Sequence, residues 1–295
     1  MSGGSQIIFQ NEHKVSIYAY DLAMAALEKF LVDRLAQGRA YFSRQDALSA
    51  LASTSVALSA ALTRLIRKGR VASPRRGFYL ILRPEDRVAG APDPVRWIDP
   101  LMRHLKSAYR ISLLRAAAFH GATHQAAMVF QVIVPRQLRN FAIGRHRLEF
   151  VYQIRADFVS VNRGDWLDSI KSDAGLAKVA GVELTLFDCA RYFHKAGGIN
   201  GLAQIVKDLG GRAKPASLIK AAAHYENSSV RRLGYLLERM GHARQAKALQ
   251  PFVKRAKTAV LLDPSVKPLL EGLDARYEKA AKWMLVINET VEVDF

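Results

Sequence analysis

Residues 43–82 read SRQDALSALASTSVALSAALTRLIRKGRVASPRRGFYLIL and decide how the rest of the chain is interpreted. Ser43, with Asp46 three residues later, is typical of a capping pair, because their short side-chain oxygens accept backbone N–H groups that a first helical turn leaves unbonded. The sequence therefore predicts a helix that begins at Arg44. The polar run from Ser53 to Ser55 predicts the start of a second helix, since hydroxyl side chains favour a cap over a helix interior.

The second helix is amphipathic by pattern, and strand-like sequence follows it. Its apolar side is expected to face the core and consists of Leu58, Leu62, Leu65 and Ile66. Its outward side repeats every four residues as Ser55, Ser59, Thr63 and Arg67. Gly69 ends the helix, and β-branched and aromatic residues flank a turn at Pro74–Gly77. This order of elements predicts a winged helix-turn-helix, with Arg75 and Arg76 at the tip of the wing.

Charge indicates what this segment binds. Residues 39–83 carry nine Lys or Arg and one acid. Duplex DNA is a dense line of negative charge whose counterions are released when cations replace them. We expect DNA contacts from Arg44, Ser53, Thr54, Ser55, Ser59, Thr63, Arg64, Arg67, Lys68, Arg70, Arg75 and Arg76. The alternative is a helical hairpin whose basic residues are only surface.

Length and composition limit the number of domains, the kind of partner and the location that can be expected. The 295 residues predict about two domains, and the net charge of +18 points to a polyanionic partner, nucleic acid before membrane. One cysteine, Cys189, excludes an intrachain disulfide and a multi-cysteine zinc site. Without a long apolar run or a secretory segment, the expected location is the cytoplasm and no membrane contact is expected.

The predicted fold class is α+β, with the winged domain in residues 1–90 and a larger mixed α/β domain in residues 91–295. The boundary is placed near Gly90 because residues 83–100 contain four prolines. A long helix is predicted before the winged segment, at Ile17–Gln37. In the second domain we expect strands at Val129–Val134, Leu148–Ile154 and Val182–Phe187, a helix at Cys189–His194, and helices at Ser217–Ala223, Ser229–Met240 and Ala243–Lys257.

A second basic segment lies at the front of the second domain. Residues 101–164 hold ten Lys or Arg and two acids. Arg136, Arg139, Arg145 and Arg147 are expected either to contact flanking DNA or another anion, or to form a solvated rim. The sequence does not decide between these readings.

The sequence lacks several common enzyme motifs. The chain has no P-loop, no G-x-S-x-G elbow and no H-E-x-x-H pattern. His120 and His124 are interrupted by Gly121, and we expect no metal, no cofactor and no catalytic residue. One alternative is a metal-dependent nuclease using Asp157, Asp165, Asp168 and Asp173 with Lys171. Another is a transcription factor whose second domain senses a small ligand.

Three segments carry a resemblance to a known family: RRGFY at residues 75–79, VRRLGYLLERMG at 230–241, and KWMLVINETVEVDF at 282–295. Together they resemble the antitoxin of the AbiE-type abortive-infection systems, which are phage-defence operons classed as type IV toxin-antitoxin modules. The resemblance implies a winged domain that binds inverted repeats in its own promoter and represses transcription. It also implies a second domain that counteracts a nucleotidyltransferase-like toxin without needing a stable complex. Within the second segment, Arg231, Arg232 and Tyr235 lie beside core leucines and are interpreted mainly as packing residues.

Overall fold

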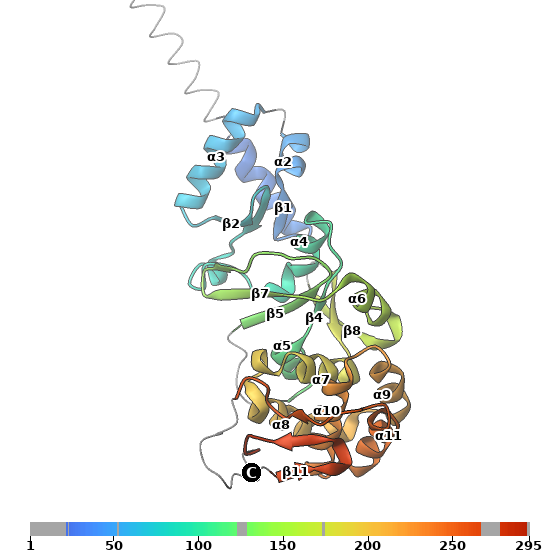
Figure 1. The fold of residues 1–295 in the computed structure, drawn as a ribbon. Helices are drawn as coiled ribbons and strands as arrows, with labels where there is room; N and C mark the ends of the chain where they lie inside the picture. Colours follow the sequence, from blue (N-terminus) through green and yellow to red (C-terminus); the bar gives the residue numbers. More distant parts are fainter. Residues whose placement is uncertain are drawn as a thin grey trace, which may run out of the picture. The chain divides into compact units, whose positions relative to one another are not determined.

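The computed structural model describes residues 22–293 except for 23, 52, 123–128, 173–174 and 267–277. Figure 1 shows its helices and strands, coloured along the sequence. Its contacts divide the chain into two units. Unit 1 comprises Met1–Ser107, Asn140–Arg147 and Ile170–Ala177, and unit 2 comprises Ala108–Arg139, Leu148–Ser169 and Lys178–Phe295. Both are mixtures of helix and strand, so the chain is a mixed α/β protein.

Unit 1 begins its described part with a helix over residues 24–36. The predicted helix also covered residues 17–21 and 23, which lie outside the described residues. The elements that follow in unit 1 are β1 (Tyr41–Ser43), α2 (Arg44–Ala50), α3 (Ser55–Arg67), β2 (Val71–Arg75), β3 (Phe78–Ile81), α4 (Ile98–His104) and β6 (Phe141–Ile143). Strands β1, β3 and β2 form an antiparallel sheet in that order.

Both helix starts predicted in residues 43–82 are confirmed. Ser43 Oγ accepts the Asp46 N–H at 3.1 Å, and Asp46 Oδ2 accepts the Ser43 N–H at 2.8 Å, so α2 begins with a complete capping box. Thr54 Oγ1 accepts the Ala57 N–H at 3.2 Å and starts α3. Local side-chain hydrogen bonds therefore fix both helix starts.

The core of unit 1 confirms three of the four apolar positions expected on α3. Leu58, Leu62 and Leu65 are buried, together with Ala61. Ile66 is 42% exposed, so its assignment to the core was wrong. Residues 58, 61, 62 and 65 already form the i, i+3, i+4, i+7 set of one helix face, and position 66 turns away from that face.

The predicted boundary near Gly90 differs from this division, because residues 91–107 belong to unit 1. Hydrogen bonds hold the proline-bearing stretch against the β6–β7 hairpin within the same unit. The Arg145 N–H donates to Ala89 O at 2.8 Å, and His146 Nε2 lies 3.0 Å from Ala91 O. The stretch read as a linker is thus packed surface in unit 1.

Unit 2 contains most of the helices. They are α5 (Leu113–Phe119), α6 (Arg155–Val161), α7 (Val182–Arg191), α8 (Gly198–Leu209), α9 (Pro215–Ala222), α10 (Asn227–Arg239) and α11 (Ala243–Val253). The larger sheet uses β4 (Arg110–Ile111), β5 (Val129–Val134), β7 (His146–Tyr152), β8 (Leu167–Ser172) and β9 (Gly175–Ala180), with strand order β6-β7-β5-β4-β9-β8. A smaller sheet has the order β10-β12-β11, from β10 (Val260–Leu261), β11 (Glu278–Ala280) and β12 (Leu285–Ile287).

The strand expected at Val182–Phe187 was wrong, because these residues form the start of α7. Every residue from Leu184 to Ala190 is buried, so the helix has no solvent face over this length. A fully buried helix shows no polar–apolar period, and a short apolar run of this kind cannot be told from a buried strand.

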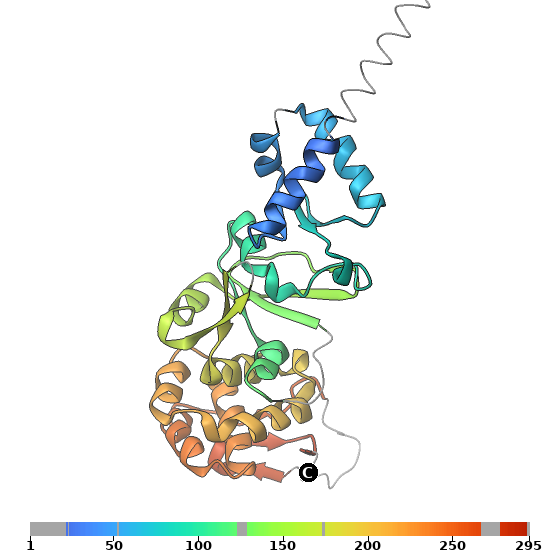
Figure 2. The ribbon, with the colours of Figure 1, turned by 180° about the vertical axis from the view of Figure 1, so that it is seen from behind.

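The last two segments behind the family resemblance contact each other in unit 2. Figure 2 shows this end of the chain, in orange and red, from behind. A Cβ at Gly234 would lie 2.0 Å from Trp283 Cζ3, so only glycine lets α10 approach this ring. Trp283 Nε1 donates to Glu238 Oε2 at 2.7 Å, and Lys282 pairs with the same carboxylate. Arg231 and Arg232 are each 4% exposed and donate to backbone carbonyls. Packing accounts for these residues of the two segments.

None of the helices that the structure describes is by itself long and apolar enough to cross a membrane; α2 and α3 reach that length and composition only as a pair bent by 118°.

Candidate nucleic-acid interface

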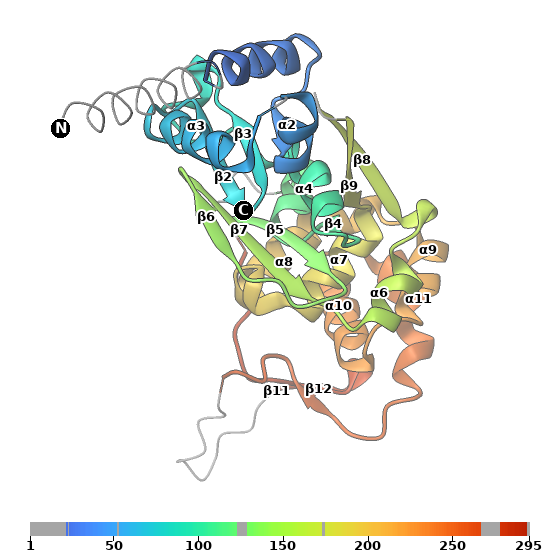
Figure 3. The same ribbon diagram turned by 90° about the horizontal axis from the view of Figure 1, so that it is seen from above.

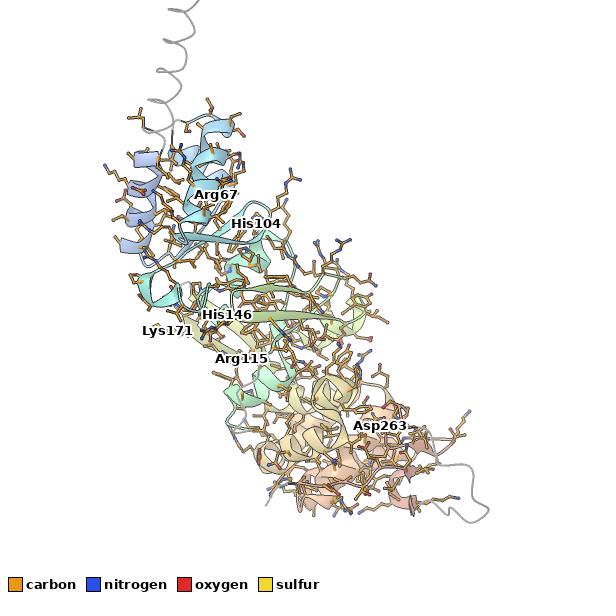
Figure 4. All side chains as sticks on the ribbon, turned by 90° about the vertical axis from the view of Figure 1, so that its left-hand side faces the viewer. Arg67, His104, Arg115, His146, Lys171 and Asp263 are labelled. Carbon is orange, nitrogen blue, oxygen red and sulfur yellow. The ribbon has the colours of Figure 1, made fainter. Side chains whose placement is uncertain are left out.

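The outward face of α3 is the central feature of the candidate site. The buried residues Leu58, Ala61, Leu62 and Leu65 define its inner side. The opposite side carries Ser59, Thr63 and Arg67, all exposed, and Figure 4 marks Arg67 on this helix. Lys68 follows at the C-cap and is also exposed. The helix therefore presents hydroxyls along its length and cations at its end.

Arg44 links the start of α2 to this face. Its Nη2 donates to Ser55 O at 2.8 Å, to Ser55 Oγ at 2.9 Å and to Ser59 Oγ at 2.7 Å. One guanidinium thus holds both serines and sets a positive charge beside the first turns of α3. The sequence predicted these three residues as site residues, but it did not predict that they contact one another.

The hydroxyl groups of Ser59 and Thr63 donate their protons to backbone carbonyls of α3. Ser59 Oγ donates to Ser55 O at 2.8 Å, and Thr63 Oγ1 donates to Ser59 O at 2.9 Å. Such bonds to the carbonyl four residues earlier are common for hydroxyl side chains within helices. Ser59 and Thr63 consequently offer acceptor lone pairs, not free protons, to a ligand.

The tip of the β2–β3 hairpin is built differently from the expected wing. Arg75 pairs with Phe78 in the strand register, so Arg76 and Gly77 form a two-residue turn in which Gly77 has φ +77°. Arg75 Cζ lies 4.2 Å from the centre of the Phe141 ring, a close cation–π contact with β6, which runs beside β2 in Figure 3. His104, labelled in Figure 4, lies with Nε2 3.2 Å from Arg76 O.

The predicted contact residues divide by exposure. The exposed ones are Thr54, Ser55, Ser59, Thr63, Arg64, Arg67, Lys68 and Arg76. Those of intermediate exposure are Arg44, Ser53, Arg70 and Arg75. Asp46, the single acid of residues 39–83, is occupied by the capping box and by Arg34 at 3.3 Å. The face around α3 is therefore strongly cationic.

The second set of basic residues is split between the units. Arg145 and Arg147 are exposed on the β6–β7 hairpin of unit 1, and Arg136 and Arg139 are exposed in unit 2. Their expected role as flanking anion contacts stays a prediction.

The carboxylates considered for a metal site have separate surroundings. Asp157 pairs with Arg191 at 3.5 Å, and Asp168 lies 3.8 Å from His120 Nε2. Asp173 and His124 lie outside the described residues. Among the residues that the structure describes, no group of three or more His, Cys, Asp or Glu could hold a metal ion.

Unit 2 contains a buried ionic cluster that the sequence did not predict. Arg110 and Asp188 are both fully buried and form two hydrogen bonds, Nε to Oδ2 at 2.9 Å and Nη2 to Oδ1 at 2.8 Å. Asp188 also accepts from Ser112 Oγ at 2.6 Å and from Tyr225 OH at 2.7 Å. Gln153 Oε1 accepts from Arg110 Nη2 at 2.7 Å. The partners lie too far apart in the chain for any local pattern to reveal them.

This cluster shifts the pKa values of its members. Burial would lower the pKa of Arg110, but the Asp188 carboxylate beside it raises that pKa overall. Burial, and then the negative charge of Asp188, raise the pKa of the Tyr225 phenol well above its ordinary value. Tyr225 therefore stays protonated and continues to donate to Asp188. We interpret the cluster as structural.

We predict that Tyr225 makes the protein less stable in alkali. Above pH ~10 the phenol ionises in the unfolded chain but keeps its proton in the fold, so the free energy of unfolding falls by up to about 1.4 kcal/mol per pH unit. Urea titrations from pH 9 to 11.5 should show this slope reduced in Tyr225→Phe. Tyr152→Phe makes the same substitution at an exposed residue (44%) and serves as the control. Parallel curves for wild type and Tyr225→Phe would contradict the prediction.

Comparison with known proteins finds a matching domain and a similar fold. Residues 110–239 match the family model of the AbiEi antitoxin C-terminal domain, which confirms the resemblance to AbiE-type antitoxins. The crystal structure of the RV2827C protein from Mycobacterium tuberculosis is similar with a TM-score of 0.62, at 15% sequence identity and over 90% of each chain. At this identity the likeness shows a shared fold alone. A search of curated proteins finds no match.

Proposed function

We propose that this chain, which carries an AbiEi antitoxin C-terminal domain, is an antitoxin that also represses its own operon. Unit 1 would be a winged helix-turn-helix that binds inverted repeats in the promoter as double-stranded DNA. Unit 2 would counteract a nucleotidyltransferase-like toxin without a stable complex. The domain match supports the antitoxin role itself, and the finer assignments are part of the proposal.

The observation that carries DNA binding is the exposed, cationic face of α3. Its middle is occupied by small hydroxyl side chains, which permit close approach to the floor of a major groove. Arg44 lies at its first turns, and Arg67 and Lys68 at its end, where they can meet the phosphates on either side. A solvated face of an ordinary domain mixes both signs of charge, and this face does not.

The hairpin would contribute less than the helix. Arg76 is exposed at the turn and is free to reach a phosphate or the minor groove, whereas Arg75 is stacked on Phe141. We therefore assign the hairpin one direct DNA contact, at Arg76, and assign Arg75 to the packing of β2 against β6.

The antitoxic activity is assigned to unit 2 because the matched residues lie mostly there. In two of the three segments that carry the resemblance, packing explains Gly234, Trp283 and two buried arginines. These residues would preserve the shape of unit 2.

Electrophoretic retardation of the full-length protein with a labelled duplex from its own promoter tests the proposal. Binding should weaken steeply with salt, and about six phosphate contacts would give a slope near −5 for log K against log salt concentration. Added magnesium should leave the duplex intact. A flat salt response would refute electrostatic binding to DNA, and cleavage would favour the nuclease alternative.

A further inference from the structure

We propose that Val56, in the first turn of α3, recognises the 5-methyl group of a thymine in the major groove. The inference rests on the proposed DNA binding by unit 1. Val56 is 70% exposed, although valine is among the residue types most often buried. An apolar side chain is thus presented to solvent in the first turn of α3, beside the hydroxyl side chains of Ser55 and Ser59.

The position of Val56 on the helix places it at the front of the candidate interface. The buried face of α3 is centred between Leu58 and Leu65. With 3.6 residues per turn, Val56 falls on one line with Thr63 and Arg67, on the side opposite that centre. In helix-turn-helix proteins the N-terminal residues of the second helix contact base edges. Val56 occupies such a position.

The serines beside Val56 are less suited to reading a base. Arg44 Nη2 donates to both Ser55 Oγ and Ser59 Oγ, and the Ser59 hydroxyl donates its own hydrogen bond to Ser55 O. A base that bonded these oxygens would compete with the Arg44 guanidinium. We therefore assign Ser55 and Ser59 to fixing the helix start and setting the distance to the groove.

The chemistry of the groove then selects the base. A valine has no donor or acceptor, so it discriminates only through apolar contact. In the major groove the thymine C5-methyl is the apolar group that distinguishes one base from the others. Burying one methyl-sized group changes affinity by a factor of about four.

The test compares thymine with uracil, which lacks only that methyl group. Duplexes would first be selected from a random library by the full-length protein, and each thymine would then be replaced in turn by deoxyuridine. We expect wild type to bind about fourfold more weakly when one particular thymine is replaced. Val56→Ala withdraws two methyl groups from the groove and should lose most of this difference at that position. Val32→Ala removes a comparable valine, 59% exposed on the helix over residues 24–36, and should keep the fourfold difference.

The outcomes separate the inference from the function on which it rests. If wild type binds the selected duplexes but tolerates uracil everywhere, the thymine contact is refuted and DNA binding stands. Retained discrimination in Val56→Ala refutes it equally. If the full-length protein enriches no duplex, DNA binding itself fails and the thymine contact falls with it.

Discussion

Asp188→Asn is expected to lower the free energy of unfolding by about 3–5 kcal/mol, the range found when one partner of a buried ion pair is removed. Asp188 is the only carboxylate that the described structure shows bonded to Arg110, and it accepts from Ser112 and Tyr225 as well. An asparagine keeps the shape but loses the charge and turns a donor toward the guanidinium. A cation would then remain fully buried without its counter-charge.

Urea unfolding followed by circular dichroism at pH 7 measures this loss. Because a domain has only about 5–15 kcal/mol of stability, the variant should be partly unfolded or close to it. Asp157→Asn is the matched control: Asp157 pairs with Arg191 at 3.5 Å with its side chain 40% exposed, and its loss should cost less than about 1 kcal/mol.

A second variant keeps the prediction testable if Asp188→Asn does not fold. Replacing both partners, as in Arg110→Met with Asp188→Asn, removes the stranded charge and should recover part of the loss. If the double variant were less stable than Asp188→Asn alone, or if Asp188→Asn matched the Asp157 control, the ion pair would not be the source of the stability.

The features of unit 1 that depend only on residues close together in the chain could be predicted from the sequence. The capping box between Ser43 and Asp46 and the turn at Gly77 each need only a few consecutive residues, and each is recognisable from them. The prediction that Ile66 is buried was wrong, because Leu65 and Ile66 are adjacent apolar residues that both fit a loose helical spacing. Which of the two is buried depends on how α3 packs against the rest of the core, and the structure buries Leu65.

Features that join distant residues were not predictable in this way. Arg110 and Asp188 are 78 positions apart, and the residues around each of them do not indicate which residue is its ion-pair partner. Arg75 was expected at an exposed wing tip, yet Phe141, far along the chain, provides the ring on which it stacks. The strands β8 and β9 were missed because they alternate weakly, with Leu176 exposed at 60% and Ala177 buried.

The same distinction applies to the candidate site. Composition and spacing identified the residues on α3, because charge and helical period are properties of the chain itself. Ser55 and Ser59 were predicted as DNA contacts, but the structure adds that Arg44 donates to both of them, and our proposal therefore treats them as spacers. The exposure of Val56 was not predicted, since an apolar residue inside a helical pattern is ordinarily assigned to the core.

Reversing two charges on α3, Arg64→Glu with Arg67→Glu, should weaken binding to promoter DNA by about 100-fold at moderate salt. Each lost charge-assisted contact is worth about 1.4 kcal/mol or more, which is a factor of ten in affinity. The slope of log K against log salt concentration should become shallower by about two, one unit for each phosphate contact removed. Fluorescence anisotropy with a labelled duplex gives both quantities.

The control carries the same change in net charge at the same helical spacing in unit 2. Arg244 and Lys247 are exposed on α11, three residues apart as Arg64 and Arg67 are on α3. Arg244→Glu with Lys247→Glu should leave DNA affinity within about twofold, because exposed charges that make no phosphate contact are screened by salt. Equal loss in both variants would mean that affinity follows net charge and not the face of α3.

The α3 variant also separates the two proposed activities in cells. A full-length protein carrying Arg64→Glu and Arg67→Glu should lose repression of a promoter reporter, because repression requires DNA. It should still restore growth when the neighbouring toxin is expressed, since neutralisation is assigned to unit 2 and Arg64 and Arg67 are exposed residues outside its core. Loss of rescue together with repression, in a variant that unfolds like wild type in urea, would place the antitoxic surface on unit 1.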